Sequence, residues 1–334
     1  MTKNRSWVDL ASERVGGTAT HANDEFFAAK ENLLQAGRGV FIEGKYTDRG
    51  KWMDGWETRR RREPGHDWCV IRLGLPGAIH RLVVDTNHFR GNHPEACSVE
   101  VCTVGEGAPD DPDALAGEWV ELLPRSVLEG HAENTFDVES SGRSTHVRLN
   151  IFPDGGVARL RVLGEVLPDW ERLSATAGPI DLVGIQNGGV ALACSDQFYS
   201  DPTNLTMPGR SENMGDGWET KRRRGPGHDW TVLRLGHRGV IEHVEVDTHH
   251  FKGNYPESCS VEGCDLSGQE SEADWEGADL PWAAVLPRTP LEAHTQHHFE
   301  QEIVSGDPFT HVRLNIYPDG GISRLRLFGR IETG

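Results

Sequence analysis

The sequence lacks several features that would indicate other classes of protein. No apolar stretch approaches the ~18–20 residues that a membrane-spanning helix needs, and the polar start contains no signal-peptide apolar region. We therefore expect a cytoplasmic protein with no membrane partner. No GxSxG, P-loop or GxGxxG fingerprint occurs, which argues against nucleotide cofactors and against a serine-hydrolase mechanism.

Cysteine and positive charge are both scarce. Six cysteines in 334 residues are too few for a disulfide scaffold, and no CxxC pair indicates a zinc ribbon, so we expect reduced cysteines that pack in the interior. Lys and Arg number 34 against 52 Asp and Glu, giving a net charge of -18. Four consecutive arginines, residues 59–62, do not provide the basic face that displaces counterions from phosphates. We predict no nucleic-acid partner.

The length and the hydrophobic content indicate two globular domains. The chain has 334 residues, whereas single cores stop growing at ~250–300 residues. Hydrophobic residues make up 36% and charged residues 26%, a balance that can bury a core.

An internal repeat is the main feature of the sequence. Three segments of the first half return in the second half: DGWETRRRREPGHDW (54–68) as DGWETKRRRGPGHDW (216–230), VDTNHFRGNHPEACSVE (84–100) as VDTHHFKGNYPESCSVE (246–262), and THVRLNIFPDGGVARLRVLG (145–164) as THVRLNIYPDGGISRLRLFG (310–329). We predict a first domain over residues 17–166, a linker over 167–187 and a second domain over 188–331.

Each copy consists of short strand-like runs. WCVIRLG, IHRLVVDT, CSVEVC, THVRLNI and VARLRVLG alternate or are β-branched, and Gly, Pro, Asn and Asp turns separate them. Only Glu25–Leu34 has a helical pattern. Regularly spaced strands with little helix predict an all-β fold of two tandem jelly-roll β-sandwich domains.

Two polar loops are expected to meet at one end of each sandwich. If the runs 68–73 and 79–86 pair as antiparallel neighbours across a tight turn, the loop 54–67 lies beside the loop 87–95. Loops at one end of a rigid sandwich commonly carry binding chemistry. The candidate catalytic residues in these loops are Glu57, His66 and His88, with the counterparts Glu219, His228 and His250.

A second polar set lies on the strand 145–151. Its alternation places Val147 on the core side and Arg148 and Asn150 on the opposite face. Charges on such a face are ordinarily solvated, but this set recurs in the second copy as Arg313 and Asn315. Function and packing stay open for these residues. Arg159 and Arg161 on the next strand recur as well, and for them we favour packing.

A metal site is not indicated by any compact ligand motif. His88, His93 and Glu95 combine nitrogen and oxygen ligands that would suit a divalent cation. However, His93 becomes Tyr255 in the second copy, and no HExxH pattern is present. We assign no metal ligands and no cofactor, with a divalent metal as the alternative.

The three repeated motifs resemble those of the allantoicase family. The resemblance covers nearly the whole chain and rests on DGWETxRRRxPGHDW, VDTxHFxGNxPE and VRLNIxPDGG. It implies a duplicated, galactose-binding-like β-sandwich and a homo-oligomeric hydrolase that acts on carbon–nitrogen bonds other than peptide bonds. The implied reaction releases urea from allantoate, a small-molecule substrate, and leaves ureidoglycolate in purine and allantoin degradation.

From the chemistry of that reaction we infer a role for each candidate residue. Hydroxide replaces urea at a carbon that carries two ureido groups and a carboxylate, so the site needs an acid, a base, a carboxylate clamp and groups that bind ureido N–H. We assign proton transfer to Glu57 and His88. The predicted substrate-binding residues are Arg148 or Arg60 for the carboxylate and Asn92 and Asn150 for the ureido group, with Asn254, Arg313 and Asn315 in the second copy.

Other functions and site arrangements stay open. The chain could be a non-catalytic tandem module that binds sugars or other ligands, because jelly rolls host many lectin-like domains, or a structural oligomerisation protein. We also expect both repeats to contribute to one site, since allantoate carries two ureido arms. Two complete sites, one in each repeat, are the alternative.

Overall fold

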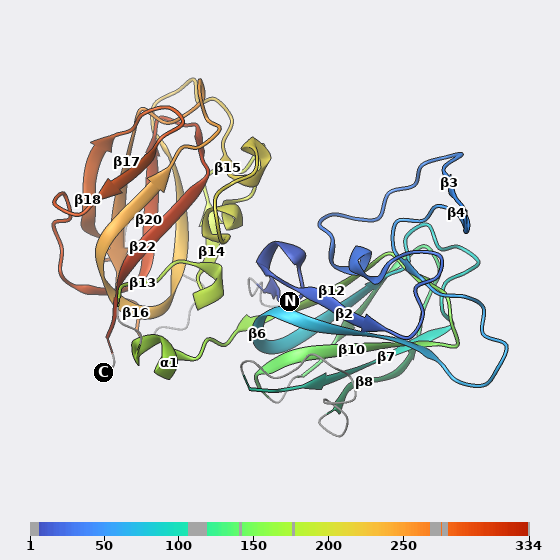
Figure 1. Cartoon of the computed structure of the whole chain (residues 1–334). Helices are drawn as coiled ribbons and strands as arrows, with labels where there is room; N and C mark the ends of the chain where they lie inside the picture. The colour runs from blue at the N-terminus through green and yellow to red at the C-terminus, as the bar shows by residue number, and fades with distance from the viewer. Residues whose placement is uncertain are drawn as a thin grey trace. The chain divides into compact units, whose positions relative to one another are not determined.

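The computed structural model describes residues 7–105, 119–139, 142–175, 178–267, 275 and 280–332. It divides into two units, Trp7–Leu167 and the chain from Pro168 onward. Strands dominate both units (Figure 1), which confirms the predicted all-β fold with two β-sandwich domains. Among the described residues, no helix is long and apolar enough to cross a bilayer.

The first unit is organised around one long strand, β6 (Asp67–Asp85). The strand order is β1-β12-β6-β10-β7-β8, and β2 and β9 also pair with β6. The other bounds are β1 Val8–Asp9, β2 Thr18–Ala22, β3 Tyr46–Thr47, β4 Gly50–Lys51, β5 Trp56–Glu57, β7 Ala96–Cys102, β8 Val120–Val127, β9 Glu133–Asp137, β10 Ser144–Phe152, β11 Gly156–Val157 and β12 Arg159–Val166, with 3₁₀ turns at Glu13–Val15 and Lys30–Leu34.

The second unit repeats this topology around β16 (Asp229–Asp247). Its order is β13-β22-β16-β20-β17-β18, with β14 and β19 again paired to the long strand. The remaining bounds are α1 Trp170–Ala175, β13 Ile180–Asp181, β14 Val190–Cys194, β15 Trp218–Glu219, β17 Ser258–Cys264, β18 Ala283–Pro290, β19 Gln296–Phe299, β20 Pro308–Tyr317, β21 Gly321–Ile322 and β22 Arg324–Ile331, with 3₁₀ turns at Ile185–Asn187, Pro202–Thr206 and Met214–Asp216.

The long strand bends, which corrects the expected hairpin. Residues 67–72 pair with β10 and residues 77–85 pair with β12, so the two predicted runs belong to one strand and have different partners. Figure 1 shows the same strong curvature in β16. The two polar loops nevertheless lie at the same end of the sandwich, as expected. The reason is that β10 and β12 are joined by the short segment around Gly155, which brings both ends of β6 to that end.

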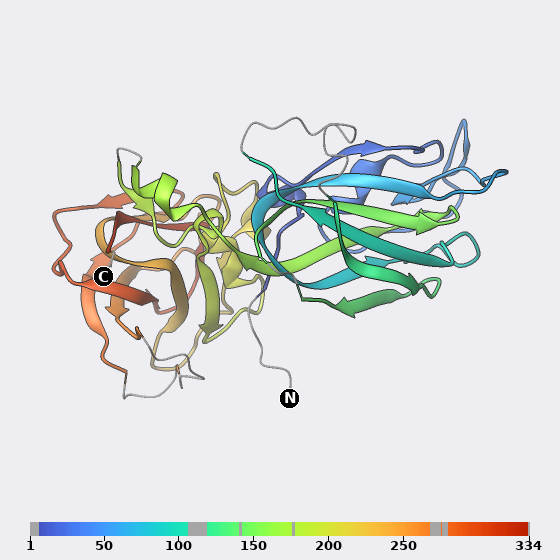
Figure 2. The ribbon, with the colours of Figure 1, turned by 90° about the horizontal axis from the view of Figure 1, so that it is seen from below.

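The alternation of β10 places the core where the sequence predicts it. Val147, Leu149 and Ile151 are fully buried, and their counterparts belong to the apolar core of the second unit. Five of the six cysteines are buried and all six are free. In Figure 2 the strands of the first unit run side by side, and the loops discussed below lie at one end.

Several local predictions differ from the structure. The segment Glu25–Leu34, expected to be helical, forms only the 3₁₀ turn Lys30–Leu34. Part of the expected linker belongs to the second sheet, because β13 pairs with β22. The matching strand β1 pairs with β12 ahead of the predicted start at residue 17. Both are two-residue strands, too short to show a period of two.

Close packing at Gly156 gives a testable prediction for this fold. A Cβ at this position would lie 2.0 Å from the Phe89 ring, which is itself fully buried. Gly156→Ala should therefore lower the free energy of unfolding by roughly 1–3 kcal/mol, as overpacking does. Urea denaturation measures the loss. Gly91→Ala is the matched control, since no atom lies within 4 Å of its Cβ position. Equal stability of the two variants would contradict the packing.

Candidate active site

Two buried tryptophans fix the segment that carries the candidate glutamates. Trp56 is fully buried and donates its indole N–H to the Asp24 carbonyl at 2.8 Å, and Trp218 does the same to Asp196 at 2.9 Å. The following residue, Glu57, pairs with Gly156 across β5 and β11. The indole anchor and the short ladder therefore hold the glutamate at the loop end of the sandwich.

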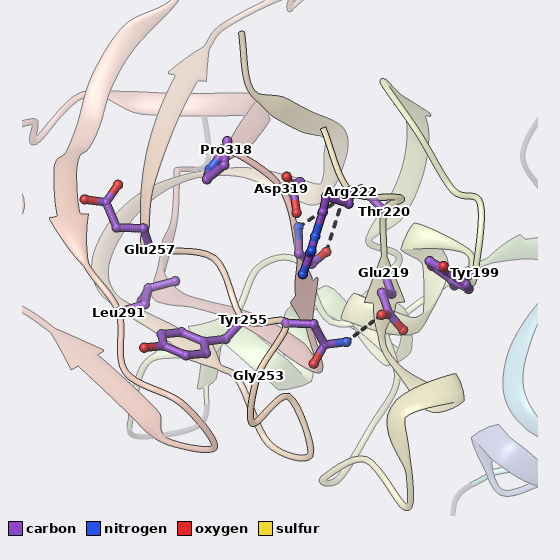
Figure 3. Close-up of a pocket in the computed structure, with 12 residues that line it drawn as sticks. Tyr199, Glu219, Thr220, Arg222, Gly253, Tyr255, Glu257, Leu291, Pro318 and Asp319 are labelled. Carbon is purple, nitrogen blue, oxygen red and sulfur yellow. Dashed lines mark hydrogen bonds between the residues drawn. The ribbon is translucent and has the colours of Figure 1, made fainter. Parts of the chain in front are cut away.

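A cavity of about 530 Å³ lies beside the corresponding glutamate of the second repeat. Its lining includes Glu219, Arg222, Asn254, Tyr255 and Asp319. Figure 3 shows Glu219 and Arg222 on the same segment, with Tyr255 on the opposite side in this view. The volume is within the ~300–1,000 Å³ typical of ligand sites, and the charged side chains in the lining suit a small, charged molecule.

Hydrogen bonds connect the three segments that form this cavity. Asn254 Nδ2 donates to Glu219 Oε1 at 2.5 Å, and the Asn254 carbonyl accepts from Gly321 N at 2.8 Å. Thr220 N donates to the Gly320 carbonyl at 3.1 Å. Because the amide nitrogen of Asn254 is engaged with the carboxylate, its Oδ1 is the atom that can accept from a ligand.

The first repeat contains the same arrangement. Asn92 Nδ2 donates to Glu57 Oε1 at 2.7 Å, Gly156 N donates to the Asn92 carbonyl at 2.8 Å, and Thr58 N donates to the Gly155 carbonyl at 3.1 Å. Burial raises the pKa of Glu57, and the hydrogen bond from Asn92 acts in the opposite direction. A carboxyl group with a raised pKa can carry a proton closer to neutral pH, as a general acid requires.

The four consecutive arginines divide into two pairs. Arg59 binds Asp24 at 2.6 Å and Arg61 binds Asp67 at 2.6 Å, so both fix the loop to the sandwich. Arg60 and Arg62 are exposed, and neither side chain has an ion pair or hydrogen bond within the described ranges. Arg60 corresponds to Arg222 of the cavity. It is therefore a free guanidinium at the position where an anion could bind.

The strand-face candidates form a second, separate group. Arg148 binds Glu100 through Nη2 at 2.5 Å and its guanidinium lies over the Trp119 ring, while Asn150 Nδ2 donates to Glu100 at 2.8 Å. In the second repeat Arg313 and Asn315 both bind Glu262. Because Glu100 already neutralises Arg148, this arginine is not a free carboxylate clamp.

The histidines divide between two places. His228 Nε2 lies 3.1 Å from Asn315 Oδ1, and the ring of His66 packs on Phe152, so this pair belongs with the strand-face group. His88 and His250 belong to a third group, where the backbone N–H of each donates to Nδ1 of a second histidine, His131 or His294, at 2.9 Å. Within the described part of the chain, no hydrogen bond or ion pair joins Glu57 to His88.

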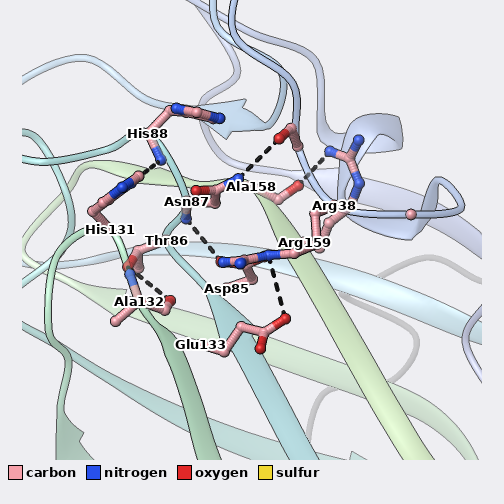
Figure 4. Close-up of polar contacts among 12 residues, drawn as sticks. Arg38, Asp85, Thr86, Asn87, His88, His131, Ala132, Glu133, Ala158 and Arg159 are labelled. Atoms are coloured by element: carbon pink, nitrogen blue, oxygen red, sulfur yellow. Dashed lines mark hydrogen bonds and ion pairs between the residues drawn. The ribbon is translucent and has the colours of Figure 1, made fainter.

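Packing explains why Arg159 and Arg161 recur. Arg159, which is labelled in Figure 4, is 3% exposed and binds Asp54 at 2.9 Å. Arg161 donates a hydrogen bond to the Gln35 carbonyl at 2.7 Å. Both side chains tie the connection that precedes β5 to the sandwich. Neither is part of a solvated face.

No group of three or more His, Cys, Asp or Glu among the described residues is arranged to hold a metal ion. The three residues considered for a cation do not gather. His93 packs toward Gly130, whereas His88 contacts His131.

Sequence reasoning missed several residues of the cavity. Asp319 lines it and accepts from Arg223 N at 2.9 Å, and Asp154 does the same for Arg61. Both stand in the repeated PDGG turn, so the repeat itself was the available signal. Tyr199 was harder to find, because Phe27 replaces it in the first copy.

Comparison with known proteins decides the family. The allantoicase repeat model matches residues 8–167 and again residues 180–332. The chain belongs to the allantoicase family. The predicted resemblance is thereby confirmed over both repeats.

Relatives within the allantoicase family are similar over nearly their whole length. A probable allantoicase of Pseudomonas aeruginosa is 51% identical over 97% of this chain and 96% of its own length. One of Burkholderia mallei is 46% identical over 98% and 96%. A crystal structure of allantoicase from Saccharomyces cerevisiae has 35% identity and a TM-score of 0.81, covering 98% of this chain and 94% of that one.

Proposed function

We propose that this chain is a hydrolase that releases urea from allantoate and leaves ureidoglycolate, and that the reaction takes place at the group formed by Glu57, Asn92 and Arg60, the counterparts of the cavity residues Glu219, Asn254 and Arg222. Family membership over both repeats supports the activity. One observation supports the location: a half-buried carboxyl group, oriented by an asparagine amide, lies on the same segment as an arginine that has no ion-pair or hydrogen-bond partner among the described residues.

The first repeat offers the groups that this substrate needs, in the arrangement that lines the cavity of the second repeat. Arg60 binds the carboxylate through two parallel N–H···O bonds, which a planar guanidinium favours. Asn92 Oδ1 accepts a ureido N–H, since its Nδ2 is engaged with Glu57. A single carboxyl group can serve both proton transfers in this site.

One proton leaves Glu57 and one returns to it in each turnover. Protonated Glu57 gives its proton to the departing urea nitrogen as the carbon–nitrogen bond breaks. The carboxylate takes a proton from the water whose oxygen bonds to the same carbon, which restores the starting state. The raised pKa of Glu57, caused by burial, favours the protonated form that the first step requires.

This assignment chooses between the two arginines that the sequence left open. Arg148 is bound to Glu100 and stacked on Trp119, so binding a substrate carboxylate there would require breaking an existing ion pair. Binding the carboxylate to Arg60 breaks no ion pair among the described residues. We therefore place the carboxylate on Arg60 and treat Arg148, Asn150 and His66 as a structural group.

Urea release from allantoate tests the function. The purified chain should produce urea and ureidoglycolate in equal amounts, measured by a coupled urea assay and by NMR of the products. Binding of allantoate or a sugar without turnover would support the ligand-binding module instead. We also propose a cytoplasmic homo-oligomer, an expectation that rests on the sequence and the family resemblance.

A further inference from the structure

The residue that follows the site asparagine lines the cavity of the second repeat. Tyr255, next to Asn254, stands in the same lining as Glu219 and Arg222 (Figure 3). No hydrogen bond engages its hydroxyl group among the described residues. The counterpart of this tyrosine in the first repeat is His93. An aromatic ring with a polar edge therefore follows the asparagine in both copies.

The backbone at this position is packed in the same way in the two repeats. A Cβ at Gly155 would lie 2.9 Å from the carbonyl carbon of His93, and a Cβ at Gly320 would lie 3.0 Å from that of Tyr255. The PDGG turn of each repeat therefore fixes where the side chain begins. His93 leaves its loop at the place that corresponds to Tyr255 in the cavity wall.

The two rings are accommodated by a second exchange between the repeats. The His93 ring lies directly on Gly130, where an added Cβ would be 2.5 Å from Nδ1. The second repeat has Ala293 at the position of this glycine, so a ring placed like that of His93 would overlap its methyl group. The pairs His93–Gly130 and Tyr255–Ala293 are thus two ways of packing a ring in the same wall.

This packing also determines which nitrogen of His93 carries the hydrogen. Nδ1 is buried and has no hydrogen-bond partner among the described residues. A buried N–H without an acceptor is costly, and a neutral imidazole carries its hydrogen on one nitrogen only. Nε2 is neither buried nor hydrogen-bonded within the described part of the chain, so it carries the hydrogen and is available to donate it.

We propose that His93 is a substrate-binding residue whose Nε2–H donates to the ureido carbonyl oxygen. The inference rests on the proposed function and deepens it, because Arg60 and Asn92 account for the carboxylate and the ureido N–H but leave this oxygen without a donor. The Tyr255 hydroxyl offers the corresponding donor in the cavity of the second repeat. A site that donates to an oxygen discriminates against analogues that lack it, since the donor then stays unpaired.

Ureidoacetate and guanidinoacetate test this donor, because they share a carboxylate and differ in whether a carbonyl oxygen or a nitrogen is present. Inhibition of urea release from allantoate gives Ki for each. His93→Phe keeps a ring against Gly130 and removes the donor. Ki for ureidoacetate should rise roughly 3–10-fold, the weight of one neutral hydrogen bond, whereas Ki for guanidinoacetate should stay within about twofold. Equal changes for the two ligands, or no change, would overturn the proposal.

A pair of double variants isolates the single polar atom. His93→Tyr and His93→Phe, each combined with Gly130→Ala, both rebuild the wall of the second repeat and differ only by one hydroxyl group. The variant with tyrosine should keep the wild-type ratio of the two Ki values, and the variant with phenylalanine should lose it. Thermal unfolding of both separates this effect from loss of fold. The same ratio in both variants would contradict a donor role.

Nitrogen-15 shifts of the imidazole examine the contact without any turnover. His93, assigned by comparison with His93→Phe, should be a single Nε2–H tautomer in the free chain, and ureidoacetate should shift its Nε2 more than guanidinoacetate does. If the wild type releases no urea, the proposed function fails, and this measurement still decides the inference. If His93 carries its hydrogen on Nδ1, or the two ligands shift Nε2 equally, the inference fails even in an active enzyme.

Discussion

Glu57→Gln should lower kcat for urea release by about 10²–10⁴-fold, because glutamine keeps the shape of the side chain and its bond with Asn92 but cannot exchange a proton. KM should change little, since the arginine and the amide that bind the substrate stay in place. The measurement is steady-state urea release at several pH values. If the variant retains wild-type turnover, Glu57 has no part in the chemistry.

Glu219→Gln is the matched control in the second repeat, where the same asparagine contact exists at 2.5 Å. If both repeats contribute to one site, as we expect from the sequence, this change should also remove most of the turnover. Two independent and equal sites would instead give about half activity in each single variant. That outcome would exclude a site that needs both copies.

The raised pKa of Glu57 also predicts a stability effect with a definite sign. A carboxyl group whose pKa is raised in the folded state stabilises the fold fully below its unfolded pKa, near 4.5, and this contribution is lost as the pH rises through the folded value. Glutamine does not ionise, so Glu57→Gln removes this pH-dependent loss of stability. The variant should therefore be more stable than the wild type at neutral pH and gain no such advantage in acid, measured by thermal unfolding across pH.

Arg60→Ala should lower kcat/KM by about 10–150-fold, the equivalent of roughly 1.5–3 kcal/mol for a hydrogen bond to a charged group. Arg60→Lys should recover part of the loss, because lysine keeps the charge but not the two-pronged contact. Steady-state kinetics with allantoate give both values.

Arg62→Ala is the control for this loop. Like Arg60, Arg62 is exposed and has no side-chain partner within the described ranges, so the two changes remove the same charge at neighbouring positions. Equal losses would indicate a general electrostatic effect. A severe loss for Arg148→Lys with an active Arg60→Ala would place the carboxylate on the strand face.

The sequence predicted the parts of the fold that depend on the alternation of side chains along a strand and on the internal repeat. Alternation in THVRLNI correctly separated Val147 from Arg148, and the repeat correctly gave two similar units. The bend of β6 could not be predicted, because GLPGA is compatible with a tight turn or with a strand that continues through a bulge. Which of the two occurs depends on the partners, β10 and β12, that lie far along the chain.

The sequence predicted which residues belong to the candidate site better than it predicted which of them contact one another. Glu57 and Asn92 do meet, and both stand in repeated loops. The sequence could not show that Arg148 is neutralised by Glu100, since the two residues lie on different strands, β10 and β7. It also could not separate Arg60 from its neighbours, because which of the four arginines pairs with an aspartate depends on loop conformation.

A crystal structure of the Glu57→Gln variant with allantoate tests the central claim most directly, because the variant should bind the substrate without turning it over. The account predicts the substrate carboxylate on the guanidinium of Arg60 and a ureido group on Asn92. Allantoate bound against Arg148 and Asn150, with no substrate at Arg60, would contradict it.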